Sequence, residues 1–497
     1  MKQKYINVLL IPMMALSLFS CQNTKSNGDV VILYTNDVHC AVDDNLGYAT
    51  LSAYLKDTKA TNPNTTLVDV GDFIQGNIMG SISKGSYIID LMNAVGYDYV
   101  TYGNHEFAYG MDQLVTLTDE LNAQALSRNF TYTGEGESPF SDEVLPYSIK
   151  DYGSCKVGFV GITTPFTISN SIPTNFMDND GNFIYSFKGE TKETFYSVIQ
   201  DNIDACRKAD ADYVILMGHL GNNDASSPFS SVDVIKNTTG ADVFLDAHAH
   251  STINSEYYEN LDGKNVILSS TGTELNAIGR LNISQSGTIS TSLITKYPKK
   301  DQVIVDKISG IKQEYEEKIN TVIGTSDVNL TRYNENGVRI VRNCETNIGD
   351  FTADAYRSIS HADIGFCNGG GIRADIAQGD ITYGDAIAVN PFGNQLSEVK
   401  ASGMEIADAL EFSYRLTQEE ASNGTSVGEN GGFFQVSGLK CDIDVSVPSS
   451  VTLDENNMFS GITGERREKI FRFFRMIRLM LPLIQTKPIL SPPLTIL

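Results

Sequence analysis

The sequence predicts a layered α/β domain followed by a second, smaller α/β domain. Short apolar runs recur along residues 30–246, and each is followed by a polar cluster. These runs predict buried strands, because strands that are covered on both faces are continuously apolar. Segments with helical spacing of apolar residues lie between some of them, as expected for a sheet covered by helices.

The predicted strands and the clusters that follow them are VVILY before TNDVH, TTLVDV before GDF, YDYVTY before GNHE, YVILM before GHLG and ADVFLD before AHAH. Helical spacing predicts helices over residues 86–95, 111–121 and 192–208. In open α/β sheets, reactive groups gather beyond the carboxyl ends of the strands. The polar clusters therefore mark the expected functional edge.

The character of the sequence changes after residue 296, where a charged, polar stretch predicts a linker helix. Beyond it lie helical patterns at 347–359 and 403–415 and glycine-rich turns at 369–371 and 431–432. We therefore expect a first domain over residues 30–296, a linker over 297–325 and a second domain over 326–464.

The last segment, residues 465–497, differs from the rest of the chain. No acidic residue follows Glu468, although the formal net charge of the whole protein is -24. A basic amphipathic membrane segment is one interpretation of its mixed basic and apolar residues. The abrupt change in composition favours a reading-frame change or a truncation in the gene.

Residues 1–21 have the features of an export signal. Lys2 and Lys4 precede an apolar run that is too short to span a membrane as a mature helix. The run ends in LFSC, which resembles a bacterial lipoprotein signal with Cys21 as the lipidated residue and residues 22–29 as a tether. An ordinary signal peptide is the alternative. We expect export to the periplasm or cell envelope, with a lipid anchor as the only membrane attachment.

The acidic composition excludes one class of partner. A sequence pI of about 4.6 argues against binding a nucleic acid polymer, because phosphate backbones are bound by an excess of Lys and Arg. A small anionic substrate remains compatible with this charge if a local positive site, such as a metal, attracts it. The cysteines form no CxxC pair, and Cys40 is expected to be a small buried hydrophobe.

Five of the six histidines lie in the clusters that follow the strands, beside two aspartates and an asparagine. This set comprises Asp37, His39, Asp72, Asn104, His105, His219, His248 and His250. One histidine alone is more often structural, but five at corresponding positions indicate ligation. Imidazole nitrogens combined with carboxylate and amide oxygens suit Zn, Mn, Fe or Co, whereas an all-oxygen set would suggest Ca or Mg.

The number of ligands predicts two divalent metal ions. Asp37 and His39, two residues apart, are expected to reach one ion from one face of an extended segment, and His248 and His250 show the same alternation. Asp72 is the expected bridge, with helix capping as its alternative role. Two ions about 4 Å apart polarise a phosphoryl oxygen and lower the pKa of a bridging water.

The ordered series TNDVH, VGDFIQG, GNHE, GHLG and AHAH resembles the calcineurin-like metallophosphoesterases, and specifically the exported 5'-nucleotidase family. NGGGIRADI, VNPFGNQL and GGFFQVSGL resemble the C-terminal domain of that family, so the resemblance covers about residues 30–464. It implies a four-layer αββα metal domain joined by a helix to a smaller α/β substrate-binding domain. It also implies that phosphate is released from nucleotides by attack of a metal-bound hydroxide. Relatives also hydrolyse nucleotide sugars and cyclic nucleotides.

The resemblance also implies roles for individual residues. One metal would be held by Asp37, His39, Asp72 and His250, and the other by Asp72, Asn104, His219 and His248. Asn104 and His105 would form the catalytic pair, with His105 donating to the phosphoryl oxygens or to the leaving group. The alternative for His105 is a structural histidine.

In the second domain the resemblance implies a binding site for a nucleotide substrate. Asn368 and Arg373 would bind the substrate, Arg342 is a further candidate, and Phe392 would stack on the base. The alternative for Phe392 is core packing. His361 matches no functional position and is expected at a helix end or on the surface.

Two departures from the family pattern predict lower activity. Position 108 is alanine where the family has an aspartate that orients the catalytic histidine, so His105 is expected to be misoriented. A later glycine-rich segment with a second stacking aromatic is missing after Gly464. The alternatives are a degenerate, non-catalytic lipoprotein that binds nucleotide or metal, and a dinuclear enzyme acting on a non-nucleotide ester or a sulfur-linked substrate.

Overall fold

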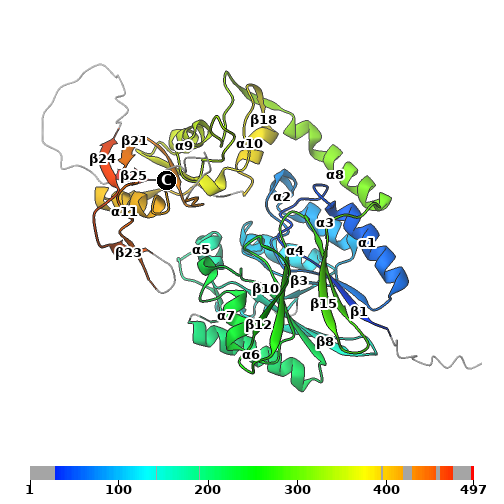
Figure 1. Ribbon diagram of the computed structural model, residues 1–497. Helices are drawn as coiled ribbons and strands as arrows, with labels where there is room; N and C mark the ends of the chain where they lie inside the picture. The colour runs from blue at the N-terminus through cyan, green and yellow to red at the C-terminus, as the bar shows by residue number, and fades with distance from the viewer. Residues whose placement is uncertain are drawn as a thin grey trace, which may run out of the picture.

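The computed structural model describes residues 28–140, 143–189, 191–392, 394, 396–417, 428–454, 459–473 and 494–496. In this part of the chain, helix α8 (Gln302–Ile319) joins two domains (Figure 1). The predictions for the signal segment, for Cys21 and for most of the tether and tail lie outside the described residues. None of the described helices combines the length and the apolar character that crossing a membrane requires.

Two large sheets form the first domain. In spatial order the first sheet contains β15 (Ile289–Ile294), β14 (Ile278–Ile283), β1 (Val30–Thr35), β2 (Thr65–Asp69), β3 (Tyr99–Thr101), β4 (Gln124–Leu126) and β6 (Val144–Leu145). The second contains β12 (Thr252–Glu259), β13 (Asn265–Thr271), β11 (Val243–Asp246), β10 (Tyr213–His219), β8 (Lys156–Thr163) and β7 (Tyr147–Asp151). β5 (Phe130–Tyr132) pairs separately with β9 (Tyr185–Phe187).

The direction of the strands in these sheets decides at which edge their carboxyl ends lie. β1, β2, β3 and β4 run parallel to one another in the first sheet, and β8, β10, β11 and β13 run parallel to one another in the second. Parallel strands place all of their carboxyl ends at one edge of a sheet. The polar clusters that follow β1, β2, β3, β10 and β11 are therefore collected at the same end of the domain.

Strand β1 shows how the layers are stacked. Val31 and Leu33 point into the cluster shared with the helices α1 (Gly47–Thr61), α3 (Ser86–Val95), α4 (Met111–Glu120) and α8. Val30, Ile32 and Tyr34 point into the cluster between the two sheets. The helices α6 (Lys192–Lys208) and α7 (Ser231–Asn237) cover the second sheet. The αββα architecture is thus confirmed, and burial of both faces explains the continuously apolar strands.

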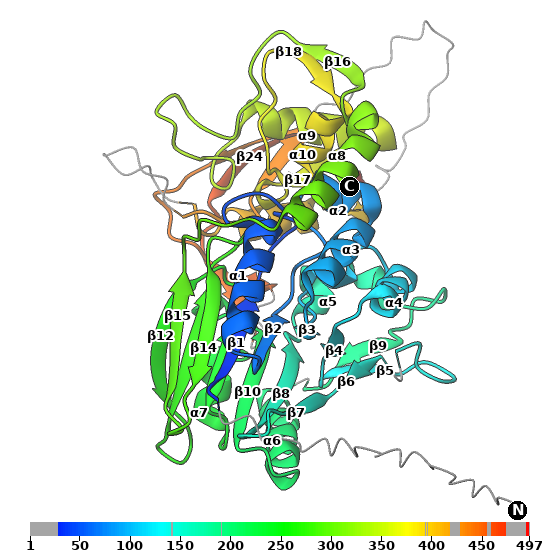
Figure 2. The ribbon, with the colours of Figure 1, turned by 90° about the vertical axis from the view of Figure 1, so that its right-hand side faces the viewer.

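The linker helix α8 is packed against the first domain. Ile304, Ile308, Ile311 and Tyr315 recur at helical spacing and are buried in the same cluster as α1 and α3. The helix then rises along α1 and α3 toward the second domain (Figure 2). The apolar stripe of α8 therefore fixes the helix that leads into the second domain against the first domain.

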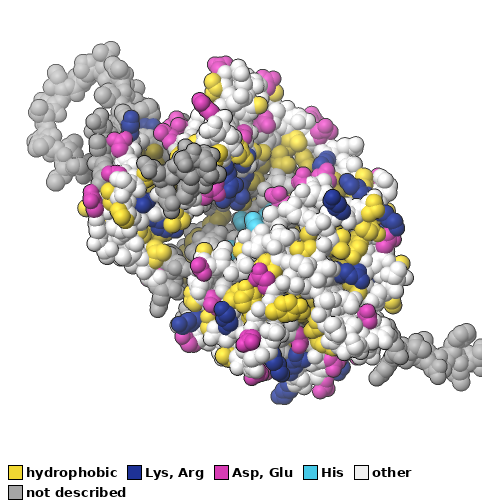
Figure 3. Space-filling model, in the orientation of Figure 1, with side chains coloured by type: hydrophobic (Ala, Val, Ile, Leu, Met, Phe, Trp, Pro, Cys, Tyr) yellow, Lys and Arg dark blue, Asp and Glu magenta, His cyan; other side chains and the backbone are white. Residues whose placement is uncertain are grey.

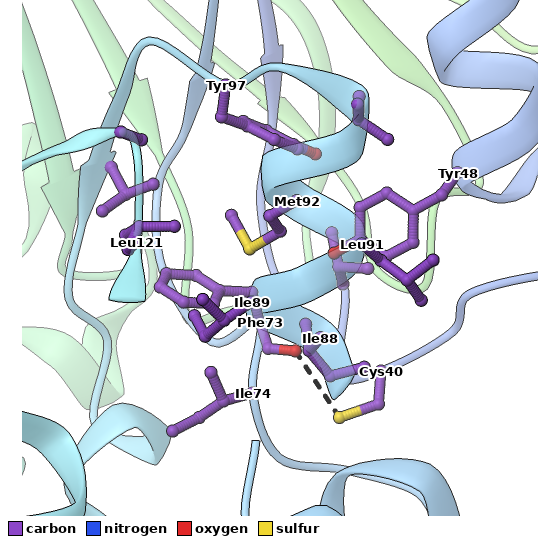
Figure 4. Packing of buried hydrophobic residues seen from close by; sticks show 14 of the residues in the cluster. Cys40, Tyr48, Phe73, Ile74, Ile88, Ile89, Leu91, Met92, Tyr97 and Leu121 are labelled. Carbon is purple, nitrogen blue, oxygen red and sulfur yellow. Dashed lines mark hydrogen bonds between the residues drawn. The ribbon is translucent and has the colours of Figure 1, made fainter. Parts of the chain in front are cut away.

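A group of core residues lies directly beneath the loop that follows β2. Phe73 and Ile74, the two residues after Asp72, pack in the same cluster as the apolar residues of α3 (Figure 4). Cys40 is fully buried, as expected, and its thiol donates to the carbonyl oxygen of Phe73 at 3.5 Å. Apolar packing thus anchors the chain on the carboxyl side of both Asp72 and His39.

The second domain contains α9 (Asn347–Ser360), α10 (Tyr383–Val389) and α11 (Gly403–Ser413) with paired strands. The pairs are β16 (Val322–Ser326) with β18 (Gly379–Thr382), β17 (Gly365–Asn368) with β20 (Phe434–Ser437), β19 (Val399–Ala401) with β25 (Leu494–Ile496), β21 (Leu439–Ile443) with β24 (Glu468–Phe473), and β22 (Val451–Leu453) with β23 (Phe459–Ile462). The short helices α2 (Ile78–Ser83) and α5 (Thr167–Asn170) belong to the first domain. The predicted α/β character of both domains is confirmed.

Both predicted boundaries of the second domain require correction. β16 begins at Val322 and pairs with β18, so the domain starts before residue 326. β24 pairs with β21 and β25 pairs with β19, so the domain continues past residue 464. Composition misplaced the second boundary because the first residues of the unusual segment complete a strand pair.

Arg467 holds this last segment in place. The residue is 7% exposed, and its guanidinium donates to the carbonyl oxygens of Thr417 at 2.8 Å and Val447 at 2.7 Å. The buried carboxylate of Glu411 accepts from the backbone N–H groups of Arg467 at 2.7 Å and Glu468 at 3.1 Å. A single buried cation therefore joins the end of α11 to the start of β24.

Arg467→Met is expected to lower the free energy of unfolding by roughly 2 to 4 kcal/mol, because several buried carbonyls would lose a charged donor. Urea denaturation measures this change. Arg466→Met is the matched control: Arg466 forms a partly exposed ion pair with Asp408, which contributes at most about 1 kcal/mol. Equal losses for the two variants would contradict the assignment.

Candidate metal centre

The side chains predicted as metal ligands meet beyond the carboxyl ends of five strands. They are Asp37 and His39 after β1, Asp72 after β2, Asn104 after β3, His219 at the end of β10, and His248 and His250 after β11. The first three strands belong to one sheet and the last two to the other. Face-to-face packing of the two sheets therefore brings the two halves of the set together.

The carboxylate of Asp72 lies in the middle of the group. Its Oδ2 is 3.1 Å from Nε2 of His219, 3.8 Å from Nε2 of His39 and 3.9 Å from Nε2 of His105. The side chain of Asp72 is 2% exposed. This central place fits the predicted bridging role better than the alternative of helix capping.

The ligand atoms fall into three groups that are compact enough to hold a cation. These are Asp37 with His39 and His250, Asp72 with His219 and His248, and His39 with Asp72 and His105, with all ligand atoms of a group within 4.8 Å of one another. Each of the first two groups contains three of the four partners that the resemblance implied for one metal. The third shows that His105 faces the same centre.

Two buried polar atoms indicate that a cation fits here. Oδ1 of Asn104 and Nε2 of His219 have no hydrogen-bond partner among the described residues. Nε2 of His219 is close to Asp72, but the pair lacks the alignment of a hydrogen bond. Buried polar atoms are rarely left without a partner, and a metal ion would satisfy both.

Most of the imidazoles are held in the neutral form that binds metals. Burial lowers the pKa of His39, His105 and His250 to about 4, and burial followed by the charge of His219 lowers the pKa of His248 to about 3. A neutral imidazole keeps the free electron pair that ligation requires. These side chains are therefore ready to act as ligands near neutral pH.

His219 behaves differently from the other histidines. Burial acts to lower its pKa, but the carboxylates of Asp72 and Asp37 outweigh burial and raise it to about 10. Burial likewise acts to raise the pKa of Asp72, but the neighbouring His219 and His105 bring it well below its usual value. Without metal, a proton on His219 compensates the charge of Asp72, and a divalent cation can take over that role.

The backbone at the ligands corrects one expectation. Asp37 and His39 were expected to alternate along an extended segment, as were His248 and His250. Instead five ligands have a left-handed backbone: Asp37 (φ 49°), His39 (47°), Asp72 (62°), His248 (77°) and His250 (55°). Each such residue costs on the order of 1 kcal/mol. The ligands are therefore directed by tight turns after the strands.

Glu106 organises these turns, a role that the sequence reasoning missed. Its buried carboxylate accepts from the backbone N–H groups of Asp72 at 2.8 Å, Phe73 at 2.8 Å and Gly103 at 2.6 Å. The only sequence signal was its place in GNHE. Glu106 thus joins the loop after β2 to the loop after β3.

Backbone carbonyls orient two of the ligands. Nδ1 of His39 contacts the carbonyl oxygen of Gln75 at 2.9 Å, and Nδ1 of His219 contacts that of Val70 at 2.8 Å. A carbonyl oxygen only accepts, so each Nδ1 carries the proton and each Nε2 faces the centre.

His105 has an orienting partner, which corrects the expectation drawn from Ala108. Its Nδ1 contacts Oε1 of the Gln75 side chain, while its Nε2 faces Asp72. Ala108 lines the same cavity and offers no polar group. Sequence spacing could not identify this contact, because Gln75 lies 30 residues away along the chain.

The second domain closes the site from the other side. A cavity of about 640 Å³ between the domains is lined by Asn104 and His105 and by the four predicted substrate residues, Arg342, Asn368, Arg373 and Phe392. A neighbouring cavity of about 820 Å³ adds Arg332 and Arg339, which the sequence reasoning did not single out. Figure 3 shows histidine and basic side chains beside one another in this hollow.

Arg342 and Arg373 make the 640 Å³ cavity locally positive, since no carboxylate is among its described lining residues. Arg332 and Arg339 are paired with Asp375 at 3.0 Å and Glu429 at 2.6 Å. Arg373 forms no ion pair among the described residues. It is reached by solvent from the cavity, yet burial between the domains, with Arg342 nearby, lowers its pKa to about 10. It stays protonated at neutral pH and can receive an anion.

The ring of Phe392 is already in contact with other side chains and is not free to stack on a base. It stacks on His105 with 5.6 Å between ring centroids, and the guanidinium carbon of Arg373 lies 4.8 Å from its centroid. Only 8% of the residue is exposed. Stacking on a base would therefore require these contacts to change. His361 is exposed at the end of α9, as expected.

Gly103→Ala is expected to lower metal affinity at least roughly tenfold, because a Cβ at this position would collide with the Asp72 carboxylate and the His219 ring. Titration calorimetry with zinc on the metal-free protein measures this loss. Gly310→Ala is the control, since its Cβ would meet open space on α8. Unchanged affinity of Gly103→Ala would show that the close approach is not needed.

Comparison with known proteins divides the chain in the same way. The model of the calcineurin-like phosphoesterases matches residues 30–252, and the model of the 5'-nucleotidase C-terminal domain matches residues 322–466. The first domain thus carries the candidate ligand set, and the second carries the arginines that face it.

Curated relatives and a solved structure are similar to this chain over most of its length. The trifunctional nucleotide phosphoesterase protein YfkN of Bacillus subtilis is 26% identical over 83% of this chain, which spans 29% of the length of YfkN. The snake venom 5'-nucleotidase of Gloydius brevicauda is 27% identical over 84% of this chain and 74% of its own length. The 5'-nucleotidase precursor of Thermus thermophilus has the same fold, with a TM-score of 0.68, 22% identity and coverage of 94% and 88%. The chain belongs to the metallophosphoesterase hydrolases that join a calcineurin-like phosphoesterase domain to a 5'-nucleotidase C-terminal domain.

Proposed function

We propose that the protein is a dinuclear metal-dependent phosphohydrolase that releases phosphate from nucleotides. The observation that carries this proposal is the meeting of six candidate ligand side chains around Asp72, across a shared cavity from Arg373, which has no ion-pair partner among the described residues. The names of the relatives, which include nucleotide phosphoesterase and 5'-nucleotidase, support the nucleotide as substrate.

The ligands support two divalent ions that share Asp72. Asp37, His39 and His250 would complete one site, and Asn104, His219 and His248 the other. Nitrogen and oxygen donors of this kind suit Zn, Mn, Fe or Co. When bound, the ions would polarise a phosphoryl oxygen and lower the pKa of a water molecule.

His105 is the side chain best placed to transfer a proton. Its Nε2 is directed at the centre, 3.9 Å from Oδ2 of Asp72, and its Nδ1 is engaged by Gln75. With the proton kept on Nδ1, Nε2 has a free electron pair, so it would first take up a proton and would then donate it to a phosphoryl oxygen or to the leaving group as negative charge develops. Asn104, the preceding residue, would hold a metal with its unpartnered amide oxygen.

The second domain would bind the substrate. The planar fork of Arg373 suits a phosphate, and Arg342 and Asn368 line the same cavity. Phe392 would stack on the base after its contact with His105 is released. The substrate would thus lie between the two domains, with its phosphate toward the metal centre.

We also propose that the protein is exported and held at the cell envelope by a lipid on Cys21. This proposal rests on the sequence of residues 1–21 and on the polar tether that follows. A lipid anchor would keep both domains outside the bilayer.

His105→Ala is expected to lower kcat for nucleoside monophosphates by roughly 100- to 10,000-fold while metal content is kept, because a proton donor is lost. His219→Ala is expected to lose bound metal as well as activity. Phosphate release and elemental analysis measure the two effects. His361→Ala, at an exposed position outside the site, is the control.

The wild-type protein provides the decisive outcome for this experiment. Failure of the folded, metal-loaded protein to release phosphate from any nucleotide would overturn the proposal. Tight nucleotide binding without phosphate release would instead support the degenerate binding protein.

Arg373→Ala is expected to raise KM by roughly 10- to 100-fold, because a charged donor to the phosphate is removed. Steady-state kinetics with a nucleoside monophosphate measure the change. Lys440→Ala removes an exposed cation of the same domain and serves as the control. An unchanged KM for Arg373→Ala would exclude the arginine from substrate binding.

A further inference from the structure

Gln75 connects three parts of the site. It follows Ile74 in the loop after β2 and is 1% exposed. Its backbone carbonyl oxygen accepts from Nδ1 of His39 at 2.9 Å. The two ends of its side-chain amide contact Nδ1 of His105 and the carbonyl oxygen of Phe392 in the second domain.

The chemistry of these groups fixes the direction of each hydrogen bond. The Phe392 carbonyl oxygen only accepts, so the NH₂ group of the Gln75 amide must face it. The amide oxygen then faces His105, and because this oxygen also only accepts, Nδ1 of His105 must donate. The ring is therefore the Nδ1–H tautomer, with Nε2 directed toward Asp72.

Among the described residues, no other side chain accepts a hydrogen bond from Nδ1 of His105. Ala108 lies one turn further on, and its backbone N–H bonds to the carbonyl oxygen of His105. Its methyl group lines the same cavity without offering an acceptor. Stacking of the Phe392 ring restricts the plane of the imidazole but does not select its tautomer.

We propose that Gln75 is a positioning residue that fixes the tautomer and the ring orientation of His105, with the carbonyl of Phe392 fixing the amide in turn. The consequence for turnover rests on the proposed phosphohydrolase function. The Gln75 amide thereby links the second domain, at the carbonyl of Phe392, to the imidazole of His105.

Gln75→Met tests this role with little change in side-chain size. It removes both amide contacts but keeps the backbone carbonyl that orients His39, so metal content should be unchanged. In the double variant Gln75→Met with Ala108→Asp, a carboxylate enters the same cavity beside His105 and can accept from Nδ1. Ser81→Ala is the matched control, because Ser81 donates to the carbonyl oxygen of Pro391, the residue before Phe392.

The first measurement does not depend on turnover. In metal-free protein labelled with ¹⁵N-histidine at neutral pH, nitrogen chemical shifts report which ring nitrogen carries the proton, and His105→Gln assigns the signal. The Nδ1–H form of His105 is expected in the wild type and in Ser81→Ala. We expect it to be lost in Gln75→Met and restored by the added Ala108→Asp. Persistence of the wild-type signal in Gln75→Met would overturn the proposal.

The second measurement separates positioning from binding. Gln75→Met is expected to lower kcat for a nucleoside monophosphate by roughly 10- to 100-fold with little change in KM, and the double variant is expected to be faster than Gln75→Met. A loss of the same size in Ser81→Ala would assign the effect to domain docking and overturn the proposal. If the wild type releases no phosphate, the proposed function fails, while the nitrogen shifts still test Gln75.

Discussion

The buried negative charge of Asp72 is the constraint on which the arrangement of the site depends. A carboxylate that is 2% exposed requires compensating positive charge or hydrogen-bond donors. The structure supplies one backbone donor, from His105 at 2.9 Å, and the protonated imidazole of His219 at 3.1 Å. These groups come from strands of both sheets, so the αββα layering is what allows them to meet. A divalent cation beside Asp72 would supply the same compensating charge.

Holding the ligands this close costs backbone energy, and the surrounding core offsets it. Asp72 has a left-handed backbone, and its neighbours Phe73 and Ile74 are buried against α3. Glu106 binds three successive N–H groups of this loop, from Asp72 to Ile74. Apolar burial and a buried carboxylate thus keep a strained turn in one conformation, as a metal site with fixed geometry requires.

Regular patterns in the sequence predicted much of this protein. The ends of α3 and α6 coincide with the predicted segments, because both helices carry a clear apolar periodicity. The polar clusters at strand ends predicted a candidate ligand set, and the structure brings these side chains together. The left-handed turns, the role of Glu106 and the contact of Gln75 with His105 could not be predicted, because they depend on segments that meet only in the folded chain. Composition also misplaced the end of the second domain, since the partners of Arg467 lie up to 56 residues away.

The position of Phe392 has a consequence for how affinity should be interpreted. In this arrangement the Phe392 ring lies between the imidazole of His105 and the guanidinium of Arg373, where it occupies part of the site. A nucleotide that stacks on the same ring must first displace it. The apparent dissociation constant would then be larger than the intrinsic one, because only the fraction of molecules with a free ring can bind the nucleotide. Tight product retention would be opposed by the same competition, since the ring can return to its place when the product leaves.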